Sequence, residues 1–147
     1  MLNTLRIQRE LLKKLTKGET ERIAIQESEQ LIYITLNYHS VVIIPKKEFF
    51  IDITKTPKII KSNVFDSFIK LQSKATAAYK TKEAKLISDK IIATKITDGT
   101  IDVWLDVDLL KDFGTDVSFK IIDSKTPVFV YENENLVGIV LPIRIAE

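Results

Sequence analysis

The sequence predicts an α+β fold. We expect one domain over residues 1–147, made of two similar halves that each contain a strand, a helix and three strands of a mainly antiparallel sheet. Several segments of five or six residues alternate apolar and polar side chains, as half-buried strands do. Helical patterns near both ends of the chain stop at Gly18 and Gly114. A composition of 45% apolar and 29% charged residues is that of a globular domain.

The first half is expected to contain a helix that ends at Gly18, followed by strands. Strands are predicted at residues 23–25, 31–36 and 40–45. The polar residues 37–40 favour a hairpin between the last two. On the helix, one side is predicted to hold Leu5, Leu11, Leu12 and Leu15, and the other Arg9, Lys13, Lys14 and Lys17.

The middle of the chain has weaker patterns. Residues 49–53 fit a strand or a helix, and residues 76–83 favour a helix and a loop equally. One or two strands are predicted over 86–96, followed by a turn at Asp98-Gly99. Ser62 is the expected N-cap of a helix. That helix would direct Phe65, Phe68, Ile69 and Leu71 inward and expose Lys70 and Lys74 on one face.

The last third shows the clearest order of elements. A strand at 101–105 leads into a short acidic helix at 106–113, and three strands follow. Pro142 cannot donate a hydrogen bond to a strand ladder, so we expect an edge position or a bulge there. The three strands are predicted over 117–121, 128–131 and 136–145, with a polar hairpin tip at 132–135.

Charge is distributed unevenly, although the net charge is only +2. Residues 1–44 carry 6 basic and 5 acidic side chains, residues 45–95 carry 12 and 5, and residues 96–147 carry 4 and 10. The middle third, at +7, is a candidate surface for phosphates or another acidic partner. All its basic residues are lysines, which suit diffuse attraction to a nucleic-acid backbone better than the reading of bases.

The side chains that usually carry catalysis are scarce. The chain has no cysteine, one histidine at a predicted hairpin tip (His39), and four isolated glycines that cannot form a phosphate-binding loop. An enzyme is therefore the least favoured class, and no cofactor is predicted. No apolar run approaches the roughly 20 residues that span a bilayer. The N-terminus lacks the layout of a secretory signal. We expect a cytoplasmic protein without a membrane partner.

Three further sets of residues have competing interpretations. The exposed face and start of the acidic helix explain Asp102, Asp106, Asp108 and Asp112 better than a metal site does, so no metal is predicted. Trp104 could anchor a partner, but such a residue more often packs against a neighbouring element. Stacking on single-stranded nucleic acid is conceivable for four aromatic residues among lysines, but their spacing favours the core: Phe49, Phe50, Phe65 and Phe68.

Three segments resemble the bacterial DNA sliding clamps, the family of the DNA polymerase III beta subunit. Residues 5–15 are similar to the opening strand and first helix of a clamp, and residues 41–50 to a strand that enters its second helix. Residues 104–113 and 117–145 are similar to the last half of its final domain. The tail Leu141-Pro142-Ile143-Arg144-Ile145 is the most distinctive part. The resemblance covers about half the chain and implies a DNA clamp fold.

The resemblance also implies a function. Clamp domains close into a ring around double-stranded DNA, so a homo-oligomer acting as a processivity or replication accessory factor is implied, with backbone contacts that do not read sequence. Clamps also bind short peptides of partner proteins in an apolar cleft at their C-terminal residues. The implied DNA-binding residues are Arg9, Lys13, Lys14 and Lys17, to which the charge distribution adds Lys70 and Lys74, and the implied partner-binding residues are Leu141, Pro142, Ile143, Arg144 and Ile145.

Two alternatives stay open. Acidic residues stand where a clamp has its second basic helix. A protein-interaction or regulatory module of phage or mobile-element origin, which keeps the fold without encircling DNA, therefore remains an alternative. Residues 127–140 also resemble the strand pair of a CBS domain, an adenine-nucleotide sensor. Pro142 interrupts the helix that follows in such domains, so this second alternative is less favoured.

Overall fold

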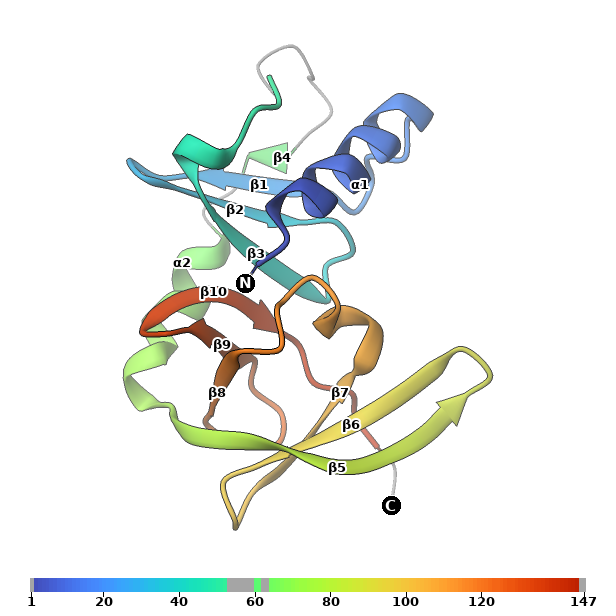
Figure 1. Cartoon of the computed structure of the whole chain (residues 1–147), viewed down its shortest axis with the longest axis vertical. Helices are drawn as coiled ribbons and strands as arrows, with labels where there is room; N and C mark the ends of the chain where they lie inside the picture. The colour runs from blue at the N-terminus through green and yellow to red at the C-terminus, as the bar shows by residue number, and fades with distance from the viewer. Residues whose placement is uncertain (1, 53–59, 62–63, 146–147) are drawn as a thin grey trace.

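The computed structural model describes residues 2–52, 60–61 and 64–145 of the chain, and within them ten strands form one sheet (Figure 1). The strands are β1 (Ala24–Glu27), β2 (Leu31–Thr35), β3 (Ser40–Pro45), β4 (Ile60–Lys61), β5 (Thr76–Ser88), β6 (Ile91–Thr97), β7 (Asp102–Asp106), β8 (Val117–Ile121), β9 (Val128–Glu132) and β10 (Asn135–Val140). Their order is β4-β1-β2-β3-β10-β9-β8-β5-β6-β7. All neighbouring pairs are antiparallel except β1 and β4, which confirms the predicted α+β class with a mainly antiparallel sheet.

Helix α1 (Thr4–Lys17) opens the described chain. Its cap residue is Asn3, whose side-chain oxygen accepts a hydrogen bond from the Arg6 backbone N–H at 3.0 Å. The helix ends where predicted, at Gly18, which adopts a left-handed conformation with φ of 71°. Residues 2–3 before it are not strand. The expected opening strand of the first half is therefore wrong, and the first half begins directly with a helix.

The buried side of α1 matches the predicted one only in part, since Leu11 is buried and Leu15 packs against the core but Leu5 and Leu12 do not. Ile7, Gln8 and Leu11 are buried against the sheet, whereas Leu5 and Leu12 are 66% and 51% exposed. Each residue turns the helix by about 100°, so Leu5 lies far around the helix from Ile7. The prediction paired the leucines and overlooked Ile7, whose position sets the apolar stripe.

A buried glutamine connects α1 to the segment after β3. That segment begins with the 3₁₀ helix η1 (Lys46–Glu48). The Gln8 amide N–H donates to the Glu48 carbonyl at 2.8 Å, and the Gln8 side-chain oxygen accepts from the Phe50 backbone N–H at 2.8 Å. Both ends of the buried amide are thus satisfied, which holds the segment against the helix. The Phe50 side chain is exposed, so its expected place in the core is wrong.

The helical segment after β4 covers the opposite face of the sheet from α1. It consists of α2 (Val64–Ile69) and the 3₁₀ helix η2 (Lys70–Lys74). On β2, Ile32 belongs to the core with α1, whereas Tyr33 packs with α2. Successive residues of a strand point to opposite faces of the sheet, so α1 and α2 lie on different faces. The expected cap residue Ser62 lies outside the described residues. The predicted inward residues do join this second core: Phe65, Phe68, Ile69 and Leu71.

The C-terminal half has the predicted order of elements, with a shorter helix. Strand β7 runs into the 3₁₀ helix η3 (Val107–Leu110), and β8, β9 and β10 follow. The Asp106 carboxylate accepts a hydrogen bond from the Asp108 backbone N–H at 2.9 Å and starts η3. The helix ends before the predicted stop at Gly114. The single 3₁₀ turn of η3, capped by Asp106, replaces the longer acidic helix that was expected at residues 106–113.

Strand β5 is the longest strand and occupies residues 76–83, where a helix or a loop was expected. It pairs with β8 through Thr76–Ala78 and with β6 along most of its length. Almost every residue of β5 is exposed, so its two faces show no contrast in polarity. Strand prediction depends on alternating apolar and polar residues, and β5 lacks this alternation because neither of its faces is buried. Its pairing with β6 and β8 determines its structure instead.

The tail after β10 closes part of the sheet on itself. The Leu141 N–H donates to the His39 carbonyl beside β3, and the Ile143 N–H donates to the Trp104 carbonyl in β7, both at 2.8 Å. Pro142 lies between them and has no N–H to donate. A proline is tolerated here because the chain stops pairing beside β3 before it begins to pair with β7. Strand β10, its tail, β7, β6, β5, β8 and β9 therefore form a closed circuit of neighbours.

Gly138 in β10 is a close-packed point of this circuit. A Cβ atom at this position would overlap the ring of Phe113, which lies directly on the strand. We expect Gly138→Ala to lower the free energy of unfolding by about 1–3 kcal/mol, because overpacking forces a large ring to shift. Chemical denaturation followed by circular dichroism measures the change.

Phe113→Leu provides the matched test of the cause. In the Phe113→Leu protein, Gly138→Ala should lower the free energy of unfolding by measurably less than in the unmodified protein, since a smaller side chain then faces the new methyl group. A loss under about 0.5 kcal/mol for Gly138→Ala alone would show that the ring moves freely and that the close contact carries no constraint.

Candidate partner-binding cleft

A concave site of about 800 Å³ lies where the tail meets the β5–β6–β7 part of the sheet. Side chains of these three strands, of the β8–β9 loop and of the tail line it. We call it the Trp104 cleft. Three of the five predicted partner-binding residues line it, namely Ile143, Arg144 and Ile145. Leu141 and Pro142 do not, because they form the crossing from β3 to β7.

Trp104 is oriented toward the cleft by strand alternation. Its neighbours Val103 and Leu105 are buried in the core, so the indole between them points to the other face of β7. The ammonium of Lys85 lies 4.6 Å from the ring centroid, a cation–π contact. Trp104 thus packs against a neighbouring strand, as the commoner interpretation predicts, and still remains half-exposed to the cleft.

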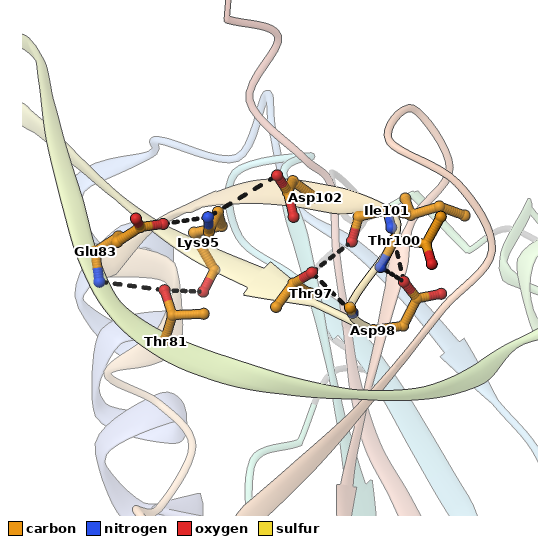
Figure 2. A network of polar contacts seen from close by, with 9 residues as sticks. Thr81, Glu83, Lys95, Thr97, Asp98, Thr100, Ile101 and Asp102 are labelled. Atoms are coloured by element: carbon orange, nitrogen blue, oxygen red, sulfur yellow. Dashed lines mark hydrogen bonds and ion pairs between the residues drawn. The ribbon is translucent and has the colours of Figure 1, made fainter.

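A chain of ion pairs joins the three strands beside Trp104. The Lys95 ammonium contacts the Glu83 carboxylate on β5 and lies 3.9 Å from the Asp102 carboxylate on β7 (Figure 2). The hydrogen bond with Glu83 raises the pKa of Lys95, and Asp102 adds to the rise. The Thr81 hydroxyl donates to the Lys95 carbonyl at 3.1 Å. Lys95 is therefore a structural cation whose charge is already neutralised.

The remaining cations of the cleft have no such neutralisation. Lys125 and Arg144 are exposed, and neither makes an ion pair among the described residues. The cleft counts four cationic side chains, with Lys85 and Lys95 included, against the two carboxylates bound to Lys95. Its excess positive charge is therefore carried by Lys85, Lys125 and Arg144, which lie around Trp104 and the tail. Such a surface attracts an acidic ligand.

The loop that carries Lys125 is shaped by Asp123. The Asp123 carboxylate accepts hydrogen bonds from the Lys125 and Thr126 backbone N–H groups at 2.8 and 2.7 Å, and one from the Thr126 hydroxyl. These bonds, the Lys125 N–H first, lower the pKa of Asp123 below its usual value of 3.8. The carboxylate thereby holds the loop in the conformation that brings Lys125 to the cleft.

A second concavity of about 1010 Å³ lies on the sheet face that η2 shares. Apolar residues of β2 and β3 form its floor, among them Tyr33 and Ile43. Its rim mixes both signs of charge, since Lys46 and Lys47 stand with Glu29 and Glu48. It has no electrostatic preference comparable to that of the Trp104 cleft, which is the better candidate.

The structure does not bring the predicted DNA-binding residues together. On α1, Arg9, Lys13 and Lys17 are exposed and Lys14 is half-buried. Lys70 and Lys74 are exposed on η2, which lies on the opposite face of the sheet. The six residues therefore form two separate basic surfaces. A duplex could not touch both through one flat contact.

The carboxylates considered for a metal have other contacts. Asp106 caps η3, the Asp108 carboxylate lies 2.8 Å from the Lys111 ammonium, and that of Asp112 lies 3.9 Å from the Arg6 guanidinium. No group of three or more His, Asp or Glu side chains in the described part of the chain could hold a metal ion. Burial raises the pKa of Asp112, an effect that Arg6 opposes. Among the described residues, no helix is long and apolar enough to cross a membrane.

The sequence singled out the tail and raised Trp104 only as the less favoured anchor, and it did not point to Lys85 or Lys125, which also line the cleft. Lys85 and Lys125 come from segments far apart in the chain, and nothing in their local sequence links them to Trp104. Comparison with protein-family models, with curated proteins and with solved structures finds no match for this chain. The interpretation of the cleft therefore rests on its own geometry.

We expect the Asp123 loop to give a pH-dependent contribution to stability. The folded pKa of Asp123 is depressed, so the contribution is present above the unfolded value near 3.8 and is lost as pH falls through the folded value. Asp123→Ala should therefore unfold at a lower temperature than the unmodified protein at neutral pH. The gap should narrow in acid.

Thermal unfolding between about pH 2.5 and pH 7 measures this gap. Asp116→Ala removes an exposed carboxylate elsewhere and serves as the control. A gap that stays constant over the whole pH range would mean that the Asp123 carboxylate does not act through its charge.

Proposed function

We propose that this protein is a non-enzymatic binding module that takes an acidic, extended segment of a partner protein in the Trp104 cleft. The single observation that carries the proposal is the placement of Ile143 and Arg144 beside Trp104, in a cleft whose cations outnumber its carboxylates. An apolar side chain of the segment would contact the half-exposed indole, and its carboxylates would meet Lys125 and Arg144.

The partner chemistry follows from what the cleft offers. The tail meets β7 through the single bridge between Ile143 and Trp104, and we infer that a further extended chain pairs with the tail on the side away from β7. Main-chain pairing of this kind supplies affinity, and the side-chain positions around Trp104 supply selectivity. An acidic segment fits the free cations, whereas a basic one would meet repulsion.

Trp104 is the only tryptophan of the chain, so its fluorescence reports on the cleft directly. Titration with an acidic peptide of about ten residues that carries a central leucine should change this fluorescence in a saturable way. Charge reversal at both Lys125 and Arg144 should weaken binding by more than about tenfold, because each variant residue then repels the ligand.

Lys13→Glu on α1 is the control for general electrostatics, since it reverses one charge far from the cleft. A lysine-for-acid version of the peptide controls for apolar contact alone. Equal binding of the acidic and the basic peptides would refute an electrostatic cleft. An unchanged affinity after both reversals would place the peptide elsewhere.

A second candidate function is association with double-stranded DNA by a clamp-like domain, as a homo-oligomer. The observation that favours it is the exposure of Arg9, Lys13 and Lys17 along one helix, where all three can reach phosphates. The strand, short helix and three strands of the C-terminal half also agree with the order in a clamp domain. A ring would require several copies of the chain with closed symmetry.

This candidate predicts binding to duplex DNA that is independent of sequence and falls with salt. Fluorescence anisotropy with a labelled duplex at several salt concentrations gives the slope of log affinity against log salt. The combined variant Arg9→Gln, Lys13→Gln and Lys17→Gln should bind more weakly if α1 faces the backbone. Light scattering gives the mass of the assembly. A monomer that binds no duplex at low salt would remove the candidate.

A further inference from the structure

The β5–β6 hairpin extends beyond the circuit of strands that closes around the tail (Figure 1). We call residues 79–97 the arm. Strand β5 pairs with β8 only through Thr76–Ala78, so from Tyr79 onward that edge of β5 has no strand neighbour in the described part of the protein. Strand β6 pairs with β7 only from Ala93 onward. Residues 79–85 and 93–97 of the arm thus belong to a three-stranded sheet with β7, and only the tip, residues 86–92, is a two-stranded ribbon without a third strand beside it among the described residues.

The arm carries much of the positive charge that the sequence places in the middle third. It holds five lysines against Glu83 and Asp89, a net charge of +3. Lys95 is neutralised at the root of the arm and Lys85 lies over Trp104. The other three lysines are exposed and make no ion pair among the described residues: Lys80, Lys82 and Lys90.

Apolar side chains stand near the tip of the same ribbon. Leu86 and Ile92 are directly opposite one another on β5 and β6 and are 72% and 50% exposed. Ile87, the next residue, is also exposed. A two-stranded ribbon is only marginally stable by itself. An exposed apolar pair at its end contributes favourable free energy only when another molecule removes it from water. The tip therefore has the character of a contact surface.

We propose that the tip of the arm, residues 86–92, enters a groove of double-stranded nucleic acid, with the Leu86–Ile92 pair against the bases and the free lysines of the tip and of β5 on the flanking phosphates. A two-stranded β-ribbon matches the width of the major groove, about 12 Å, and apolar side chains can also wedge between base steps in the minor groove. Lysines give backbone contacts without sequence selectivity.

A second copy of the chain fits the arm less well. Two arms paired edge to edge would bring two net charges of +3 together, and like charges opposite one another destabilise strand pairing. The inference shares its ligand with the DNA-association candidate but uses a surface distant from α1, and it does not involve the peptide proposal. DNA binding by the arm and DNA binding by α1 can therefore be refuted independently.

The test compares two variants of equal charge change. The arm variant carries Lys80→Gln, Lys82→Gln and Lys90→Gln. The matched control carries Arg22→Gln, Lys47→Gln and Lys120→Gln, three exposed basic residues outside the arm, α1 and the Trp104 cleft. Binding of a labelled duplex is measured by anisotropy from about 50 to about 200 mM salt. We expect the arm variant to bind more than about tenfold more weakly and to lower the salt slope by up to about 2.7, while the control stays near the unmodified protein. Leu86→Ser with Ile92→Ser should weaken binding without changing the slope, because these residues contact no phosphate.

Each other outcome overturns the inference in a distinct way. If the α1 variant Arg9→Gln, Lys13→Gln and Lys17→Gln loses binding and the arm variant does not, DNA association holds but occurs through α1. If the arm variant and the control lose binding equally, the attraction depends only on the net charge of the protein. If the unmodified protein binds no duplex, DNA association itself fails. If the arm variant alters the mass in light scattering and leaves DNA binding unchanged, the arm serves self-association.

Discussion

The crossing of the tail from β3 to β7 is the constraint on which the rest of this structure depends. Two main-chain hydrogen bonds attach the tail to two different parts of the sheet: Leu141 donates to His39, just before β3, and Ile143 donates to Trp104 in β7. Each contributes only about 1 kcal/mol by itself. Together they hold β7 near β10, although the sheet order separates these strands by β9, β8, β5 and β6. Pro142 fits between the two bonds because neither strand requires an N–H from it.

The crossing also creates the cleft. Trp104 faces outward from β7 because Val103 and Leu105 are required by the core, and the tail then runs beside it. The ion pairs of Lys95 tie β5 and β7 to β6 at the same level, which fixes the floor of the site. An element that closes the fold thus also supplies residues for binding. Substitution of Ile143, which makes the bridge to β7, would therefore affect folding and recognition together, so the exposed charged groups of Lys125 and Arg144 are better probes of function.

The parts of the fold that sequence could predict are those with a buried face and a clear local signal. The strand at 40–45 and the C-terminal hairpin were predicted because apolar runs end at polar turns, and Gly18 ended α1 through its left-handed conformation. Strand β5 was missed because both of its faces are exposed. In α1, Leu5 and Leu12 misled the assignment, since only packing on the sheet identifies Ile7 as the centre of the buried stripe. The cleft could be predicted only in part, because Lys85 and Lys125 reach Trp104 through long-range pairing that no local pattern encodes.

The cleft and the arm share one electrostatic neighbourhood. Lys85 belongs to the arm and lies on the indole of the cleft, and Lys95 stands at the root of the arm. The Debye length is about 8 Å at physiological salt, so charges this close act on one another with little screening. If an acidic segment occupies the cleft, it lowers the positive potential at the root of the arm and opposes the binding of a polyanion there. Linkage makes this opposition reciprocal, because each ligand weakens the other by the same factor. The binding of an acidic segment in the cleft and of nucleic acid on the arm would therefore be negatively coupled without direct contact between the two ligands.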